Sequence, residues 1–287
     1  MYLPHFALAD APFRLTPDTA FFYPGSTHQA ALNMLLVALS EGEGFVKVTG
    51  EVGLGKTMLC RALLGALDDG FHSCWIPNPD HSPSSMRAAL ARELGLVLPH
   101  NPGPDKLLRM IGERLVQLAA DGRRVVLLID EAQALPAPTL EAVRLLTNLE
   151  TEQRKLLQVV LFGQPELDRR LAQPGLRQLL QRISFSHRLA PLDAAAVADY
   201  VRHRLRIAGH PSGELFSARA LRRLARSSGG VPRLINILAH KALLVAFGRG
   251  RAQVDVAALA RAEADTESLP LSPWRRLARR CWPGLAS

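Results

Sequence analysis

Eight consecutive residues have the types and spacing of a loop that binds phosphate groups. Residues 50–57 are Gly-Glu-Val-Gly-Leu-Gly-Lys-Thr, which matches the pattern Gly-x-x-x-x-Gly-Lys-[Ser/Thr]. The glycines let backbone N–H groups surround the β- and γ-phosphates of a nucleotide beside the charge of Lys56, and the Thr57 hydroxyl can ligate Mg²⁺. An ordinary glycine turn is the alternative, but residue usage produces this pattern by chance in only about one chain in a hundred of this length.

A pair of carboxylates supplies the second part of such a site. Asp130 and Glu131 directly follow the apolar run Val125–Ile129. One carboxylate would hold Mg²⁺ through water, and the other would orient or deprotonate the attacking water. An acidic pair alone is a weak signal, because such pairs commonly lie on solvated loops. Placed after the phosphate loop, on what should be the neighbouring strand, the pair indicates hydrolysis, as in an ATPase rather than a kinase.

The sequence favours ATP over GTP as the nucleotide. The Asn-Lys-x-Asp motif that recognises guanine does not occur in it. ATP and Mg²⁺ are therefore the expected ligands of the phosphate loop and the acidic pair.

Strands and helices alternate around these two motifs. Strands are predicted at 44–49, 73–76, 125–129, 156–162 and 183–189, and helices at 26–40, 56–67, 84–94, 105–120 and 138–153. The runs 125–129 and 156–162 are apolar throughout, as in strands buried on both faces of a parallel sheet. Ser26 and Gln29 form a capping-box pattern where the first helix should begin. The predicted fold class is α/β, with a parallel sheet flanked by helices.

Strand signals stop after residue 191. Helices are predicted at about 193–208, 217–227, 233–247 and 255–264. We therefore expect an N-terminal linker and first helix at 1–43, a nucleotide-binding core at 44–191, a small all-α lid at 192–266 and a tail at 267–287.

Composition and charge narrow the class of protein. Of the 287 residues, 48% are hydrophobic, which excludes a disordered chain. The three cysteines, Cys60, Cys74 and Cys281, form no Cys-x-x-Cys pair, so neither a zinc site nor a disulfide framework is encoded. The first residues lack the pattern of a signal peptide, and the longest uncharged run, 19–40, is interrupted by Pro24 and Gly25. A cytoplasmic protein is expected.

The charge is uneven along the chain. Residues 1–150 hold 12 basic and 16 acidic side chains, whereas residues 151–287 hold 23 and 10. An anionic partner is therefore expected to contact the second half.

Several motifs together resemble those of AAA+ ATPases. Residues 50–57 and 130–131 match Walker A and Walker B, and Gly229-Gly230-Val231-Pro232-Arg233 opens a helix in the lid. The motifs that flank these are similar to the general secretion pathway protein A (ExeA) family, which includes the MSHA pilus biogenesis ATPase MshM. They are Met1-Tyr2, Pro12-Phe13, Pro17-Asp18, Phe22-Tyr23, Leu161–Leu167 and Leu176–Ile183, and the similarity covers about residues 1–265.

This resemblance implies roles for further residues. Arg233 would be the sensor 2 arginine that reaches the γ-phosphate of its own subunit, and Gln164 would stand at the sensor 1 position. Arg182 would be the arginine finger that acts on a neighbouring subunit, with Arg177 as its competitor; solvated surface arginines are the alternative. Nucleotide would be bound by Gly50, Glu51, Val52, Gly53, Leu54, Gly55, Lys56, Thr57 and Met58, metal by Thr57 and Asp130, and water would be activated by Glu131.

The resemblance also implies a cellular role. The protein would be a homo-oligomer that uses ATP to assemble or remodel a type II secretion or type IV (MSHA-type) pilus complex at the inner membrane. The N-terminal segment, with Phe13, Phe22 and Tyr23, would wrap the adenine, unless these aromatic residues simply pack on the sheet.

The tail has the pattern of a short basic amphipathic helix. Residues 272–282 contain four arginines opposite an apolar face of Trp274, Leu277, Ala278, Cys281 and Trp282. Such a helix fits an anionic membrane surface or a partner protein, and a disordered terminus is the alternative. Longer members of the family continue from here into a transmembrane segment and a periplasmic peptidoglycan-binding domain.

Two other functions are compatible with the sequence. A nucleotide-gated scaffold would bind ATP and barely hydrolyse it. A DNA-binding ATPase of the transposition-regulator type would use phosphate contacts from the basic half, although no helix-turn-helix is present. The arginines available for that role are Arg202, Arg204, Arg206, Arg219, Arg222, Arg223 and Arg226.

Overall fold

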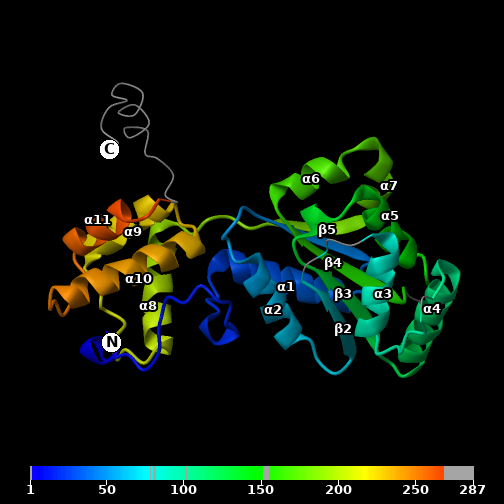
Figure 1. The fold of residues 1–287 in the computed structure, drawn as a ribbon, viewed down its shortest axis with the longest axis horizontal. Coiled ribbons are helices and arrows are strands. Elements are labelled where there is room, and N and C mark those ends of the chain that lie inside the picture. The colour runs from blue at the N-terminus through cyan, green and yellow to red at the C-terminus, as the bar shows by residue number, and fades with distance from the viewer. Residues whose placement is uncertain (1, 78, 80–81, 101, 151–154, 268–287) are drawn as a thin grey trace. The chain divides into compact units, whose positions relative to one another are not determined.

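The chain forms two compact units. The computed structural model describes residues 2–77, 79, 82–100, 102–150 and 155–267. Of the described residues, those within 17–190 form a unit built on a sheet, and residues 2–16 join residues 191–267 in a helical unit (Figure 1). The expected linker of residues 1–43 is thus shared between the two units.

A five-stranded parallel sheet forms the core of the first unit. Its strands are β1 (Phe45–Thr49), β2 (Phe71–Ile76), β3 (Arg124–Ile129), β4 (Leu157–Gly163) and β5 (Ile183–Arg188). They lie in the order β2-β3-β4-β1-β5 and every pairing is parallel. This confirms the predicted α/β class.

The strand order corrects one prediction. The strand of the acidic pair, β3, does not neighbour the phosphate-loop strand β1, because β4 lies between them. All seven residues of β4 are buried, and the strand pairs along both of its edges. Position along the chain did not reveal this insertion, because pairing partners are chosen by packing between distant segments.

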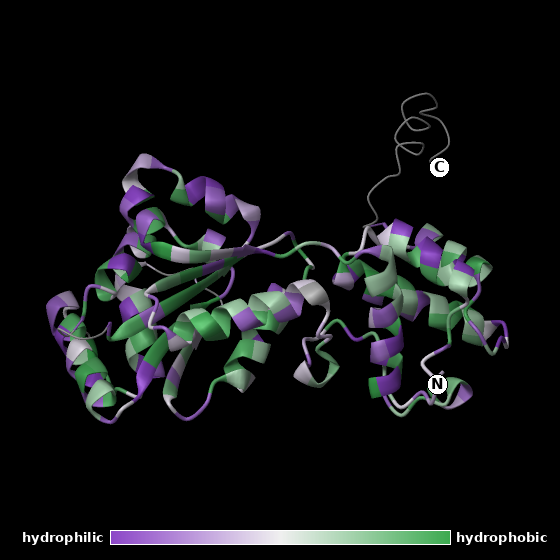
Figure 2. Cartoon of the chain, turned by 180° about the vertical axis from the view of Figure 1, so that it is seen from behind, coloured by the Kyte–Doolittle hydropathy of each residue, from purple (hydrophilic) through white to green (hydrophobic). Residues whose placement is uncertain are grey.

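Helices cover both faces of the sheet (Figure 1). On one face lie α1 (Ser26–Ser40) and α2 (Lys56–Ala66), which contact β1, β4 and β5. The other face carries the main hydrophobic cluster beneath α3 (Pro83–Glu93), α4 (Pro104–Ala120), α5 (Ala137–Leu146), α6 (Pro165–Leu171) and α7 (Arg177–Arg182). Figure 2 shows the apolar residues along the central strands and polar residues on the outer sides of the helices.

Two helix ends differ from the prediction. Helix α1 begins at Ser26, so Gly25 is its N-cap, and the Gln29 amide donates to the Asn33 side chain at 2.8 Å instead of forming a capping box. Helix α5 ends at Leu146 rather than near residue 153. The Thr147 hydroxyl bonds back to the Arg144 carbonyl at 2.8 Å, and a bridge between residues 150 and 155 turns the chain toward β4.

In its described residues, the second unit contains four α-helices. They are α8 (Ala194–Ile207), α9 (Ala218–Ser228), α10 (Pro232–Gly248) and α11 (Val256–Ala264). The turn between α9 and α10 requires glycine, because Gly229 and Gly230 have φ of 58° and 74°. A Cβ on Gly230 would lie 2.0 Å from the carbonyl oxygen of Leu192. The Gly-Gly pair therefore allows the chain just before α10 to pack directly against the backbone of Leu192.

The N-terminal residues pack onto these helices. Phe13 is buried edge-on against Phe216, with ring centroids 6.0 Å apart, and the Arg204 guanidinium donates to the Pro12 carbonyl at 2.5 Å. Among the residues that the structure describes, no helix combines the length and apolarity that crossing a bilayer requires. The predicted tail helix at 272–282 lies outside these residues.

Candidate nucleotide site

The phosphate loop joins the carboxyl end of β1 to the first turn of α2. Gly53 and Gly55 have φ of 83° and 88°, conformations that residues with a Cβ rarely adopt. They turn the chain so that Gly55 is the N-cap of α2 and Lys56 is its first residue. The positive end of the helix dipole and the loop N–H groups therefore lie together, as an anion requires.

Lys56 spans the loop from within. Its side chain is buried, and its Nζ donates to the carbonyl oxygens of Gly50 at 2.7 Å and Glu51 at 3.1 Å. Burial lowers the pKa of Lys56, while the carboxylates of Glu131 and Asp130 oppose this shift. The two carbonyl oxygens hold the ammonium group at the loop, and the phosphate oxygens of a nucleotide would compete with them for its hydrogen bonds.

Thr57 meets the acidic pair across the sheet. Its hydroxyl donates to Oδ2 of Asp130 at 2.6 Å, although β4 separates the two strands. Asp130 is 2% exposed, and burial raises its pKa; the Thr57 hydroxyl and the Glu131 N–H both oppose this rise. Because parallel strands end at one edge, the loop and the pair converge there.

The oxygen atoms of Thr57 and Asp130 are suitable ligands for Mg²⁺. A hydroxyl and a carboxylate are hard oxygen ligands, and Mg²⁺ in nucleotide sites takes one or two protein ligands together with phosphate oxygens and water. Within the described parts of the chain, no cluster of three or more His, Cys, Asp or Glu side chains forms a metal site by itself. The two oxygen donors beside the phosphate loop are therefore the candidate ligands.

Glu131 is held in an unusual conformation. Its φ of 51° and ψ of 36° place a non-glycine residue in the left-handed region. Its Oε2 accepts from the Gln133 amide at 2.5 Å and from the Gln164 amide at 3.2 Å. The residue expected at the sensor 1 position, Gln164, thus contacts Glu131. Gln133 was not foreseen, since its only signal was an amide two residues after the acidic pair.

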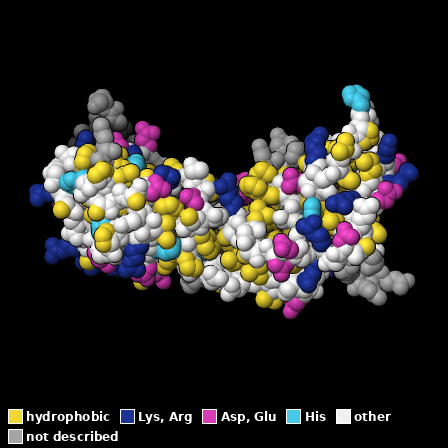
Figure 3. Space-filling view, turned by 90° about the horizontal axis from the view of Figure 1, so that it is seen from below, with side chains coloured by type: hydrophobic (Ala, Val, Ile, Leu, Met, Phe, Trp, Pro, Cys, Tyr) yellow, Lys and Arg dark blue, Asp and Glu magenta, His cyan; other side chains and the backbone are white. Residues whose placement is uncertain are grey.

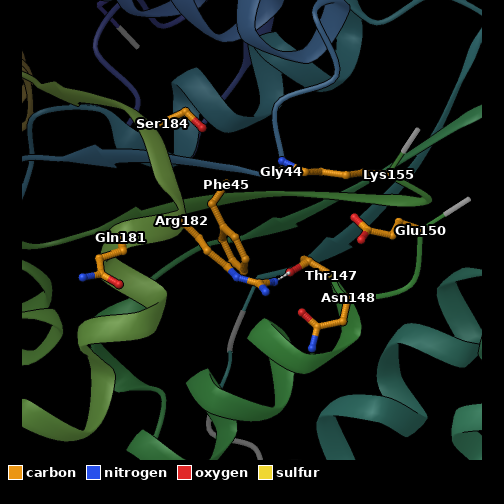
Figure 4. A pocket seen from close by; sticks show the side chains of 9 residues that line it. All are labelled: Gly44, Phe45, Thr147, Asn148, Glu150, Lys155, Gln181, Arg182 and Ser184. Atoms are coloured by element: carbon orange, nitrogen blue, oxygen red, sulfur yellow. Dashed lines mark hydrogen bonds between the residues drawn. The ribbon is translucent and has the colours of Figure 1, made fainter. Parts of the chain in front are cut away.

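Arg182 lies at the opposite edge of the sheet. It ends α7 and precedes β5, so it lies at the amino ends of the strands, whereas the phosphate loop lies at their carboxyl ends. The length of a strand, about 16 Å, therefore separates the two along the strand direction. The Arg182 guanidinium donates to the Thr147 hydroxyl at 3.3 Å, beside a pocket of about 460 Å³ that Lys155 and Glu150 also line (Figure 4). Arg177 is exposed and makes no hydrogen bond or ion pair within the described residues. Within the described residues, neither arginine has a hydrogen bond or ion pair to the phosphate loop or the acidic pair.

The remaining candidates are divided between the units. Arg233 is the exposed second residue of α10 in the helical unit. Phe13 belongs to the same unit, whereas Phe22 lies in the sheet unit. The Phe22 ring meets the buried His28 edge-on at 6.4 Å, and His28 Nε2 lies 2.7 Å from the Leu54 carbonyl of the phosphate loop. Burial lowers the pKa of His28, which favours the neutral ring.

Comparisons with known proteins show which family the chain resembles. A family model described as an AAA domain matches residues 39–171. General secretion pathway protein A of Aeromonas hydrophila is 45% identical over 250 residues, which are 87% of this chain and 46% of that protein. The chain therefore spans about half the length of this curated relative.

Solved structures share the fold at low sequence identity. The Aeropyrum pernix ORC2 protein, in ADPNP and ADP complexes, has a TM-score of 0.67 and 14% identity, and the match covers 92% of this chain and 75% of that one. Cdc6p of Pyrobaculum aerophilum has a TM-score of 0.67 at 19% identity, with 86% and 71% covered. The RuvB branch migration motor of Thermotoga maritima has a TM-score of 0.53 at 15% identity, and the match covers 84% of this chain and 69% of that one. The fold is that of P-loop AAA+ proteins, a parallel sheet unit followed by helices.

Proposed function

The chain carries an AAA domain and is a homologue of general secretion pathway protein A, and from this premise we propose that it hydrolyses ATP to ADP and phosphate with Mg²⁺. The observation that carries the proposal is the convergence of Lys56, Thr57, Asp130 and Glu131 at one edge of the sheet. The contact between Thr57 and Asp130 joins the phosphate loop directly to the acidic pair.

Each residue of this cluster has a distinct task. Lys56 would exchange its two carbonyl partners for the β- and γ-phosphates, while Thr57 and Asp130 would hold the metal. Mg²⁺, when bound, neutralises phosphate charge. Glu131 orients the attacking water and accepts its proton.

The assembly is proposed to complete the site between subunits. Arg182 is too far along the sheet to serve its own loop, which supports a role for it on a neighbour's nucleotide in a homo-oligomer. Arg177 is the alternative finger, and Arg233 is assigned to the γ-phosphate of its own subunit. Hydrolysis is proposed to drive assembly or remodelling of a type II secretion or MSHA-type pilus complex, from the cytoplasmic side of the inner membrane.

Two variants test the assignment. Lys56→Ala should abolish binding of a fluorescent ATP analogue, whereas Glu131→Gln should bind it and accumulate an assembled species in size-exclusion chromatography. Lys106→Ala, at an exposed position on α4, is the matched control. Hydrolysis by Glu131→Gln at the wild-type rate would refute the role of Glu131. ATP-dependent assembly of the wild type with negligible phosphate release would support a nucleotide-gated scaffold instead.

A second candidate, DNA binding, is favoured by one helix. The exposed face of α9 carries Arg219, Arg222 and Arg226, which make no hydrogen bond or ion pair within the described residues. Their spacing places three positive charges along about 10 Å of the helix. Such a row could contact successive phosphates.

The other arginines considered for DNA are engaged within the protein. Arg204 is buried, Arg202 pairs with Asp199 and Glu214, and Arg223 pairs with Glu263. The exposed Arg206 donates to the Ser212 carbonyl at 3.3 Å. On the face drawn in Figure 3, basic and acidic side chains are interspersed rather than gathered. The row on α9 is therefore the specific feature behind this candidate.

Measuring phosphate release with duplex DNA and with anionic liposomes, each at two salt concentrations, separates the secretion or pilus role from DNA binding. If the protein acts on a complex at the inner membrane, we expect liposomes to stimulate hydrolysis. Stimulation by DNA alone, lost in a variant with all three α9 arginines changed to Gln, would support DNA binding and refute the secretion or pilus role.

A further inference from the structure

Gln133 uses both ends of its side-chain amide next to the acidic pair. Its Nε2 donates to Oε2 of Glu131 at 2.5 Å, and its Oε1 accepts the backbone N–H of Gln164 at 2.9 Å. Gln164 directly follows β4, and its own amide donates to the same Oε2 at 3.2 Å. The carboxylate of Glu131 is therefore tied to the end of β4 by two amides.

The surroundings of Gln133 hold it in this position. Gly163 lies so close that a Cβ there would be 3.3 Å from the Gln133 Oε1 and 2.7 Å from Leu167. The backbone carbonyl of Gln133 accepts a hydrogen bond from the Arg170 guanidinium on α6. The main chain and the side chain of Gln133 are thus both anchored to the segment that follows β4.

Glu131 needs such an anchor. Its left-handed backbone is a strained conformation for a residue with a side chain, and the free carboxylate of a Glu side chain has several rotamers. A general base must lie within about 2.6–3.2 Å of the proton that it accepts. Both amides bond to Oε2, which leaves Oε1 free of them to meet water.

We propose that Gln133 is a positioning residue that holds the carboxylate of Glu131 for hydrolysis and couples its orientation to the end of β4. The inference rests on the proposed ATPase function. It goes beyond that function because it assigns the placement of the base to a residue outside the phosphate loop and the acidic pair. Gln133 acts through Glu131 and does not itself touch the nucleotide.

Gln133→Met tests these hydrogen bonds, because methionine has nearly the length and volume of glutamine and removes both of them. In steady-state ATP hydrolysis we expect kcat to fall about 10- to 100-fold, with KM for ATP within about twofold of the wild type. Gln133→Glu should also lower kcat, because it keeps an acceptor for the Gln164 N–H and replaces the amide donor with a repelling charge. Gln117→Met, at an exposed site on α4, is the matched control and should leave both constants unchanged.

A double variant separates positioning from general damage. In a Glu131→Gln background the base is absent, so adding Gln133→Met should cause no further loss of the residual rate. An unchanged or raised kcat in Gln133→Met, or a further loss in the double variant, would overturn the inference. A wild type that binds ATP without hydrolysing it would instead refute the proposed function, so the two failures are distinguishable.

Discussion

Replacing Thr57 with Val should destabilise the sheet unit even without nucleotide. Valine has nearly the shape of threonine and lacks the hydroxyl that donates to Asp130 at 2.6 Å. Asp130 is 2% exposed, so water cannot easily replace the lost donor. The Glu131 N–H, which donates to Oδ1 at 2.9 Å, and the charge of Lys56 still favour the charged carboxylate in the variant.

The size of the effect follows from the kind of bond. A hydrogen bond to a charged group contributes about 1.5–3 kcal/mol, and its loss around a buried carboxylate falls at the upper end of that range. For a unit of this size, a loss of about 3 kcal/mol corresponds to a decrease in Tm of about 6–12 °C. Thr57→Ser retains the hydroxyl and should keep most of the stability.

The pH dependence gives a second measure of the same bond. Burial raises the folded-state pKa of Asp130 above its unfolded value, so the folded state binds more protons and stability falls as pH rises through that interval. Thr57→Val removes a donor that favours the charged form, and so raises this pKa further. The penalty of the variant should therefore be fully present above the folded-state pKa and shrink as pH falls through it.

Thermal unfolding of the nucleotide-free protein, followed by circular dichroism between about pH 4 and pH 8, measures both effects. Equal Tm values for wild type and Thr57→Val near neutral pH would refute the reasoning. So would a penalty that is independent of pH, because the hydrogen bond to charged Asp130 would then not be its cause.

Three other perturbations have expected outcomes. Gly230→Ala should cost more than about 2 kcal/mol in chemical denaturation, because of the positive φ and the 2.0 Å approach to a carbonyl oxygen. Asp168→Leu should be more destabilising than Lys47→Met in the same assay, since Lys47 is buried and would be left without the carboxylate that it bonds, whereas Asp168 is 39% exposed. Arg182→Ala should bind ATP normally and hydrolyse it about 10³-fold more slowly. If the arginine acts on a neighbouring subunit, mixing this variant with Glu131→Gln subunits should restore activity. Mixtures as inactive as their components would exclude that role.

The local sequence was sufficient for the parts of the site that depend on backbone conformation and periodicity. The glycines of residues 50–57 predicted a phosphate loop because positive φ angles require them, and the structure has two such angles there. The buried runs 125–129 and 156–162 predicted strands because a continuous apolar stretch must be covered on both faces. Helix α5 was predicted too long, since no local pattern showed that the chain beyond Leu146 pairs Glu150 with Lys155 instead of continuing the helix.

Only the tertiary structure determined which side chains meet. The insertion of β4 between β1 and β3 is a choice among distant pairing partners, which no local pattern encodes. That insertion places Gln164 beside Glu131 and allows Gln133 to join the two. Residue types and spacing therefore predicted the chemistry of the nucleotide site, whereas the restraint on its catalytic base arises from long-range packing that brings the ends of β3 and β4 to one edge of the sheet.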